Sequence, residues 1–356
     1  MNVEPSRRAC TRDLLLSASA QAVSFASVAR RRCVVAALLG FLFLGSEAVG
    51  KVTITPINYR GWSDALALDN GKAVIVVVPS IGRVLQFGIK GHEGVFWENT
   101  NLYGKMADIT LPVWASRDWV NFGGDKAWPS PEADWSARTG RKGWRPPPGF
   151  DGMPYSGEIK GNAVVLHSFV DPFYGLEVQR RVELHSSQAE MTITTTFKQV
   201  QGDAIQVGVW VVTQLRHPVG LFAPRPRSSF FPQGFVVLGQ GLPPSLTISN
   251  RLLSLSRSTN QAHKIGLDAG RLLWVGEKHS LLIESSRQSG GEYPDQGSNA
   301  EIYTNPDPLA YIELETLSPV VTLKPGHTLK HRNVYTLRPR RYPDAPAEVE
   351  ARAILQ

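Results

Sequence analysis

The chain has 356 residues, with 38 basic and 31 acidic side chains and a formal net charge of +7. Six of the basic and three of the acidic residues lie in the first 48 residues, so the remainder carries 32 basic and 28 acidic residues. This balance is too even to predict a basic surface that binds nucleic acid. The only cysteines, Cys10 and Cys33, lie in the same leader. Disulfides, a thiol nucleophile and a zinc–thiolate site are therefore excluded from the rest of the chain.

Residues 1–48 have the order of a secretory signal peptide. Three arginines at 30–32 precede an apolar run at 34–44, and small residues follow directly. The run is too short to span a bilayer comfortably, so we expect cleavage, no stable membrane insertion, and a periplasmic or extracellular protein. The alternative is a retained N-terminal anchor. The part before the run is long, which favours an over-long N-terminal extension with translation starting near Val28.

From residue 51 onward the sequence predicts β-strands throughout. Runs of β-branched residues are separated by Gly, Pro, Asn and Asp, and the Asp-Asn-Gly phrase at 69–71 is typical of a hairpin turn. Only the tail after Pro343 suggests a helix. We expect strands within 51–62, 65–78, 83–89, 162–169, 176–184, 190–200, 205–213, 246–255, 272–275, 280–284, 310–315 and 327–337.

This succession of short strands without alternating helices predicts an all-β fold, a large antiparallel sandwich or barrel. An all-β unit of this size can form one domain, so we expect a single domain over residues 49–356. The Pro-rich segment 223–241 is the best linker by composition. We interpret it as a long loop inside that domain, because strands of the same character follow it.

The stretch 111–151 departs from the strand pattern and is the first candidate for a functional site. It has neither helical nor strand periodicity, which predicts a long irregular loop, and its many aromatic rings favour an ordered one. In one interpretation the indoles plug an end of the sandwich. In the other they form a sugar-binding platform whose polar groups, Asn121, Asp125 and Lys126, bond hydroxyls. Five of the nine tryptophans lie here: Trp114, Trp119, Trp128, Trp135 and Trp144.

The strand at 310–315 is the second candidate. By strand alternation, Glu313 and Glu315 share one face with Tyr311, which brings two acidic side chains together. On a solvent-exposed face they would pair with arginines. In a site they would supply the two carboxyl groups that acid–base or glycosidase chemistry needs. Further candidates for contacts with a ligand are Lys264, Tyr293, Asp295 and Glu301, and from the first stretch Trp114 and Trp128.

Other motifs of known chemistry are missing from the sequence. There is no Gly-rich phosphate loop, dinucleotide fingerprint, Gly-x-Ser-x-Gly elbow or His-Glu-x-x-His helix. The eight histidines are scattered, apart from His327 and His331. We therefore predict no cofactor, no metal and no nucleic-acid partner, with a saccharide as the expected ligand. The sequence does not indicate an oligomeric state.

A series of phrases along the chain resembles an uncharacterised exported bacterial family, domain of unknown function 4380. In order, the phrases are NYRGW, VVPSIGRVLQFG, VFWEN, NFGGDKAWPSP, WRPPPGFDG, KIG, EYPDQGSNAEIYTN and YIELETLSPVVTLKPG, and they extend over about 59–337. The family is similar to the galactose mutarotase-like carbohydrate-binding superfamily. This resemblance implies a large two-sheet antiparallel β-sandwich, or supersandwich, and the family name carries no activity.

Two further phrases resemble the aldose epimerases of that superfamily. The closing segment LETLSPVVTLKPGHTLKHRNVYTL is similar to theirs, and the match implies the role of catalytic base for Glu315. The stretch VVTQLRHPVGL is loosely similar to the segment that carries the general acid, which implies that role for His217. Base and acid together would open an aldose ring.

Three functions remain open at this point. The first is an exported protein that binds a saccharide in a Trp-rich cleft without catalysis. The second is a carbohydrate-active enzyme, an epimerase or else a lyase or hydrolase. The third is a non-catalytic scaffold of the cell envelope. A buried Glu315 that faces a pocket near Asp125 would favour the first two functions, whereas an exposed glutamate pair and tryptophans packed wholly in the core would favour the third.

Overall fold

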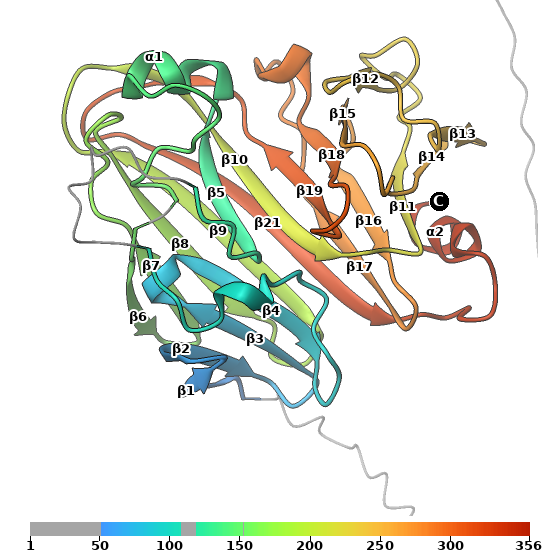
Figure 1. The fold of residues 1–356 in the computed structure, drawn as a ribbon, viewed down its shortest axis with the longest axis horizontal. Coiled ribbons are helices and arrows are strands. Elements are labelled where there is room, and N and C mark those ends of the chain that lie inside the picture. Colours follow the sequence, from blue (N-terminus) through green and yellow to red (C-terminus); the bar gives the residue numbers. More distant parts are fainter. Residues whose placement is uncertain (1–50, 108–118, 152) are drawn as a thin grey trace, which may run out of the picture. The chain divides into compact units, whose positions relative to one another are not determined.

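Two large antiparallel β-sheets build the protein (Figure 1). The computed structural model describes residues 51–107, 119–151 and 153–356. Residues Ala48–Gln356 form one compact unit. The expectation of an all-β, two-sheet antiparallel sandwich is confirmed, because strands dominate the described chain and every pairing between them is antiparallel.

The first sheet has eleven strands among the described residues. Strand β20 (Val321–Leu323) extends it by pairing with one end of β10. In sheet order the other strands are β1 (Thr53–Tyr59), β2 (Trp62–Asp69), β3 (Ala73–Val78), β4 (Arg83–Ile89), β5 (Asp125–Ser130), β10 (Ile205–Arg216), β19 (Tyr311–Leu317), β18 (Ala300–Thr304), β15 (His263–Leu267) and β12 (Val236–Val237).

The second sheet has ten strands in the same part of the chain. In sheet order these are β13 (Thr247–Ser249), β14 (Leu252–Leu255), β11 (Gly220–Pro224), β16 (Arg271–Val275), β17 (His279–Glu284), β21 (Thr328–Pro339), β9 (Glu190–Gln199), β8 (Leu176–Leu184), β7 (Ala163–His167) and β6 (Ser156–Lys160).

Helices are short. The predicted C-terminal helix is present as α2 (Ala347–Leu355), whose Ala351 and Leu355 pack on Phe222 of β11 and Leu273 of β16. No helix in the described ranges is long and apolar enough to cross a bilayer. The remaining helices are α1 (Trp135–Thr139) and the single-turn η1 (Pro79–Ile81), η2 (Thr100–Leu102), η3 (Glu132–Asp134) and η4 (Asp295–Gly297).

The main core lies between the sheets. Phe96, which forms a bridge with Leu215 of β10, packs on Tyr335 of β21 in the second sheet, with ring centroids 6.4 Å apart. Strand β8 alternates strictly between buried and partly exposed residues, the pattern of a strand with one face in the core and one toward water. In contrast, β5 and β19 are buried at every position. Protein therefore covers both faces of the first sheet at its centre.

Strand β5 corrects the prediction that 111–151 is irregular throughout. Its sequence, Asp-Lys-Ala-Trp-Pro-Ser, shows no alternation because both faces are buried, and it contains Pro129. A proline is tolerated where one strand edge makes no hydrogen bonds. That condition holds here, since β4 pairs with β5 only through Asp125 and the rest of β5 pairs with β10 alone.

Candidate functional site

Strands β5 and β10 present different residues to the two sides of the first sheet. Asp125 and Thr213 face inward, because both contact Tyr335 of the second sheet. Since successive side chains of a strand point to opposite faces, Lys126 and Gln214 face outward. The outer face is where the candidate site lies.

Two consecutive glycines allow the tight turn that leads into β5. Gly123 and Gly124 have φ angles of 94° and 70°, in the left-handed region that favours glycine. A Cβ on Gly123 would lie 2.2 Å from the carbonyl oxygen of Trp97. The Gly-Gly pair therefore lets β5 start directly against the segment around Trp97 and Glu98, which forms a bridge to Gly123.

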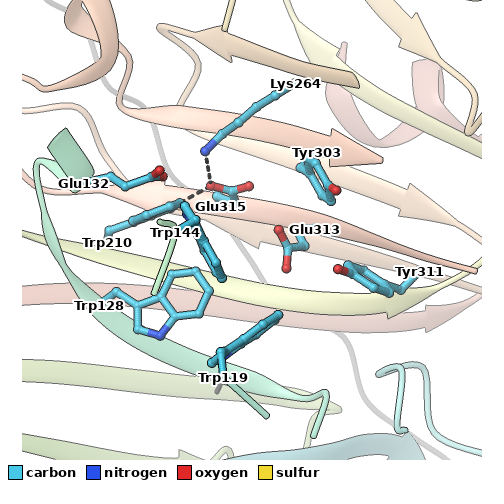
Figure 2. Close-up of a pocket in the computed structure, with 10 residues that line it drawn as sticks. All are labelled: Trp119, Trp128, Glu132, Trp144, Trp210, Lys264, Tyr303, Tyr311, Glu313 and Glu315. Atoms are coloured by element: carbon cyan, nitrogen blue, oxygen red, sulfur yellow. Dashed lines mark hydrogen bonds and ion pairs between the residues drawn. The ribbon is translucent and has the colours of Figure 1, made fainter. Parts of the chain in front are cut away.

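A cavity of about 360 Å³ lies on this outer face, and we call it the aromatic pocket (Figure 2). Its volume is at the small end of the range for small-molecule sites. Five adjacent strands, β5, β10, β19, β18 and β15, and the segments on either side of β5 contribute to its lining. The lining residues are Trp119, Trp128, Glu132, Trp144, Trp210, Lys264, Tyr303, Tyr311, Glu313 and Glu315.

Tryptophans form one wall of the aromatic pocket. Trp128 of β5 and Trp210 of β10 are cross-strand partners, with ring centroids 5.1 Å apart. Trp119 and Trp144 pack on Trp128 at 6.0 and 5.4 Å. Trp128 and Trp210 are buried, whereas Trp144 is 44% exposed. The cluster thus has a buried part and an exposed part, and the exposed ring of Trp144 can contact solvent or a ligand.

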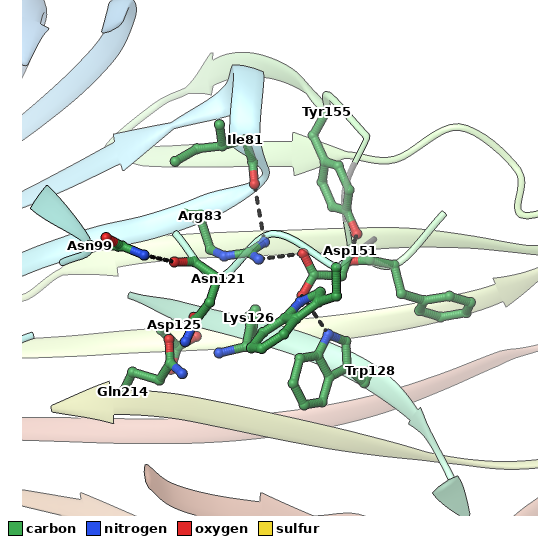
Figure 3. A network of polar contacts seen from close by, with 12 residues as sticks. Ile81, Arg83, Asn99, Asn121, Asp125, Lys126, Trp128, Asp151, Tyr155 and Gln214 are labelled. Carbon is green, nitrogen blue, oxygen red and sulfur yellow. Dashed lines mark hydrogen bonds and ion pairs between the residues drawn. The ribbon is translucent and has the colours of Figure 1, made fainter. Parts of the chain in front are cut away.

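Asp151 holds two of these rings by hydrogen bonds, and Figure 3 shows the one to Trp128. Its Oδ2 accepts hydrogen bonds from the indole nitrogens of Trp119, at 3.0 Å, and Trp128, at 2.9 Å. Its Oδ1 pairs with the buried guanidinium of Arg83, which also donates to the Ile81 carbonyl at 3.1 Å. Because Arg83, Asp151 and Trp128 are buried, this ion pair orients the tryptophan wall rigidly.

Glu315 has one occupied and one unoccupied carboxylate oxygen. Trp210 Nε1 donates to Oε2 at 2.6 Å, and Lys264 Nζ lies 3.1 Å from the same atom. Oε1 has no hydrogen-bond partner among the described residues. Glu315 lines the aromatic pocket, and its buried Oε1 keeps unused capacity to accept a hydrogen bond.

Glu301 lies behind Lys264 and shares it with Glu315. It is the cross-strand partner of Glu315, and its Oε2 lies 2.7 Å from Lys264 Nζ. Burial, reinforced by the charge of Glu315, raises the pKa of Glu301 well above its usual range despite Lys264. For Lys264, burial works against the charged form, but Glu301 and Glu315 outweigh it and raise the pKa well above the usual value. Lys264 is therefore a fixed cation.

Glu313 has a pKa shifted into the neutral range. Gln214 donates to its Oε1 at 2.8 Å, and Lys126 Nζ lies 3.9 Å from the same atom. Burial raises the pKa of Glu313 to about 7, with Lys126 opposing and Glu315 adding to the shift. Burial also lowers the pKa of Lys126 to about 8. A carboxyl group with a pKa near 7 can donate or accept a proton at neutral pH.

Several predicted site residues meet here. Glu313, Glu315, Lys264 and Trp128 line the aromatic pocket, and the alternation argument for the glutamate pair holds. Glu301 and Lys126 lie directly behind it, in contact with Lys264 and Glu313 respectively. Trp114 lies outside the described residues.

Other predicted contacts are not brought to the pocket. Asp125 is buried between the sheets, paired with Arg180 of β8. Tyr293 uses its hydroxyl to accept from the Gln288 backbone N–H at 2.7 Å and is not a lining residue. Two residues lie close by without lining it: Asn121 beside Tyr311, and Asp295, whose charge acts on Glu301.

His217 is not placed as the partner of Glu315. Glu315 is in register with Val212, five residues before His217, which is about 16 Å along the strand direction. His217 is exposed and lines a separate cavity, where its Nδ1 accepts from Arg257 Nε at 2.9 Å. The acid–base pair implied by the resemblance is thus not assembled, because β10 ends between the two positions.

Sequence reasoning did not assign a contact role to several lining residues. Trp210 lies on a strand distant in sequence, and only the pairing of β10 with β5 brings it to Trp128. Trp119 and Trp144 had been singled out only as members of the aromatic stretch. Glu132, Tyr303 and Tyr311 complete the set, and Tyr311 was detectable because it shares the alternation of Glu313 and Glu315.

The described residues contain no group of three or more His, Cys, Asp or Glu side chains arranged to hold a metal ion. His331, one of the paired histidines, is buried beside Thr316, whose hydroxyl lies 3.0 Å from its Nε2. Burial lowers its pKa to about 4.

The fold is similar to that of several solved structures. A candidate aldose 1-epimerase from Klebsiella pneumoniae has a TM-score of 0.56 at 10% identity, covering 85% of this chain and 86% of its own. A galactose mutarotase-like protein from Lactobacillus casei has a TM-score of 0.51 at 11% identity, covering 77% and 100%. A galactose mutarotase related enzyme from Lactobacillus acidophilus has a TM-score of 0.50 at 10% identity, covering 77% and 97%. At these identities the likeness shows the fold alone.

In sequence, no curated protein matches the chain significantly. One family model does, over residues 64–338, which is more than half of the chain. The chain therefore belongs to the family described as domain of unknown function (DUF4380).

Proposed function

We propose that this protein binds a saccharide in the aromatic pocket. A sugar ring combines an apolar C–H face with a rim of hydroxyls. The pocket offers the matching surfaces, because indole rings lie beside carboxylates and an ammonium group. The observation that carries the proposal is the free Oε1 of Glu315, held in place through Oε2 beside the ring of Trp210.

Two arguments support a ligand-binding role over a scaffold role. Glu313 and Glu315 are buried and line a cavity, whereas a scaffold would leave such a pair exposed and ion-paired on the surface. The proteins similar in fold are described as aldose 1-epimerase or galactose mutarotase-like, which makes a sugar the natural first class of ligand to test.

A saccharide screen read by intrinsic tryptophan fluorescence tests the proposal. Four tryptophans line the pocket, so an occupant is expected to shift the emission. Glu315→Gln should weaken binding by about tenfold or more, because a charged hydrogen bond contributes about 1.5–3 kcal/mol. Glu183→Gln, on β8 of the second sheet, is the matched control and should bind normally. A folded protein that binds no mono- or oligosaccharide would refute the proposal.

A second candidate is acid–base chemistry on the bound sugar, with Glu315 as base and Glu313 as acid. The observation that favours it is the pKa of about 7 of Glu313, two positions from Glu315 on one strand face. Ring opening of an aldose needs both roles. Polarimetry would detect mutarotation of a sugar found in the screen. Loss of turnover with retained binding in Glu313→Gln is the expected result, and an inert wild-type protein would leave binding as the function.

We further propose export from the cytoplasm, on the order of charged, apolar and small residues in 1–48. Fractionation of cells that express the full chain with a C-terminal tag, with the mass of the recovered protein, tests this. Shortening by the leader is expected. A full-length protein in the cytoplasmic fraction would contradict export.

A further inference from the structure

The aromatic pocket is followed on the same face by a second cavity, of about 300 Å³. Its lining includes Val76 and Gln86, and Val76 packs in the outer cluster with Trp62 and Phe122, not in the core between the sheets. The second cavity therefore opens on the outer face of the first sheet, as the aromatic pocket does. Its main polar lining residues are Tyr59, Arg60, Gln86, Lys90, Glu93 and Arg216.

Arg216 and Tyr311 form the boundary between the two cavities. They are in-register partners on β10 and β19, so their side chains lie next to each other on one face. Tyr311 lines the aromatic pocket and Arg216 lines the second cavity. From the level of Glu315 to that of Arg216 the strand advances four residues, about 13 Å, which is longer than one sugar ring.

An aromatic ring also marks the boundary. Trp97 is partly exposed and packs on Tyr311 with ring centroids 4.7 Å apart. Its backbone N–H donates to the Gln214 carbonyl at 2.9 Å, which holds the backbone of Trp97 beside β10. Apolar ring surface thus continues from the aromatic pocket through Tyr311 to Trp97.

The charges of the second cavity are balanced. Arg216 pairs with Glu93, and Lys90 lies 2.7 Å from Asp69. Arg60 lies 3.8 Å from Glu98, a buried carboxylate that also accepts from Tyr59 and Tyr103. With each lining cation already opposed by an acid, this surface suits hydroxyls and not an anionic group.

We propose that the ligand is a neutral oligosaccharide of two or more units, with one unit in the aromatic pocket and the next passing Trp97 and Arg216 into the second cavity. The inference rests on the proposed saccharide function and specifies its substrate class. Stacking on Trp97 and hydrogen bonds to Arg216 would supply the affinity for the additional units.

Calorimetric titration of the full chain with oligosaccharides of increasing length tests the proposal. The probes are glucose with malto- and cello-oligosaccharides up to four units, and galactose with β-galacto-oligosaccharides. In at least one series, affinity should rise about tenfold or more from one unit to three, which corresponds to about 1.4 kcal/mol. An oligogalacturonate series should bind no tighter than the neutral series.

Two variants test which residues provide the increase in affinity with oligosaccharide length. Trp97→Ala and Arg216→Ala should each reduce the ratio of trisaccharide to monosaccharide affinity, whereas Arg181→Ala on β8 should not change it. The two substitutions are in different segments, so one remains informative if the other fails to fold. A monosaccharide that binds as tightly as its longer chains would overturn the inference and leave the proposed function intact. Tighter binding of the oligogalacturonate series would contradict the proposal that the ligand is neutral. Absence of all saccharide binding would overturn both this inference and the proposed function.

Discussion

The two faces of β5 and β10 carry buried polar clusters of opposite character. On the inner face, Asp125 accepts from Thr213 at 2.6 Å and Tyr335 at 2.7 Å and pairs with the guanidinium of Arg180. On the outer face, one residue further along each strand, Lys126 and Gln214 meet Glu313. Adjacent residues thus serve two separate networks.

The networks differ in how completely they are satisfied. Both carboxylate oxygens of Asp125 have partners, and the network joins the two sheets through β8 and β21. In the outer cluster, Lys126 Nζ and Glu315 Oε1 have no hydrogen-bond partner among the described residues. A satisfied buried network specifies a fold, whereas buried groups without partners cost stability and call for another role. This contrast separates a structural cluster from a candidate site.

The largest effect is expected from Asp125→Ala. The substitution leaves the buried guanidinium of Arg180 without its carboxylate, which should lower the free energy of unfolding by about 3–5 kcal/mol. Urea denaturation measures the change. Asp203→Ala, at an exposed position, is the control and should stay within about 0.5 kcal/mol of wild type. A loss as small as that of the control would mean that Asp125 does not join the sheets.

Glu315→Gln should mainly affect ligand binding and not stability, in contrast to Asp125→Ala. Ligand affinity is expected to fall by about 1.5–3 kcal/mol, while the free energy of unfolding changes by about 1 kcal/mol or less. The stability change is small because the substitution also removes the like-charge repulsion with Glu301. Calorimetry and urea denaturation on one preparation give both values. Strong destabilisation would place Glu315 with the structural cluster.

Comparison of the pH dependence of stability between the wild type and Glu313→Gln should isolate the contribution of Glu313. Burial raises its pKa to about 7 in the folded protein, so between about pH 4.5 and pH 7 the unfolded chain loses this proton first. The folded state keeps this proton in that window, so the contribution of Glu313 to stability should fall as pH rises, by on the order of 1 kcal/mol. Denaturation at pH 5 and pH 7.5 measures the slope. Glu313→Gln should reduce the fall, and an identical slope in both proteins would contradict the assignment.

The smallest effect is expected from the tryptophan wall. Trp119→Phe keeps a ring but removes one hydrogen bond to Asp151, which should cost about 1 kcal/mol of stability. Trp128→Phe removes the equivalent bond from a buried indole and should cost more. Thermal melts of the two variants give the order. The reverse order would indicate that Asp151 holds the exposed part of the wall and not the buried part.

Local pattern was sufficient for much of the fold and for part of the site. The period of two in 310–315 placed Glu313 and Glu315 on one face, and it needs no knowledge of neighbouring strands. Turn residues between strands and the missing helical periodicity predicted an antiparallel sandwich or barrel, and the phrases shared with the family implied the two-sheet sandwich. Strand β5 was missed because a strand buried on both faces shows no alternation.

The composition of the aromatic pocket was decided by tertiary structure. Asp125 and Lys126 looked like one polar group in the sequence, yet the pairing of β5 with β10 sends them to opposite faces. The same pairing brings Trp210 to Trp128, and the length of β10 carries His217 away from Glu315. Strand partners and register depend on contacts between residues far apart in the chain. The sequence by itself therefore determined which residues share a strand face, and only the folded sheet decided which faces meet.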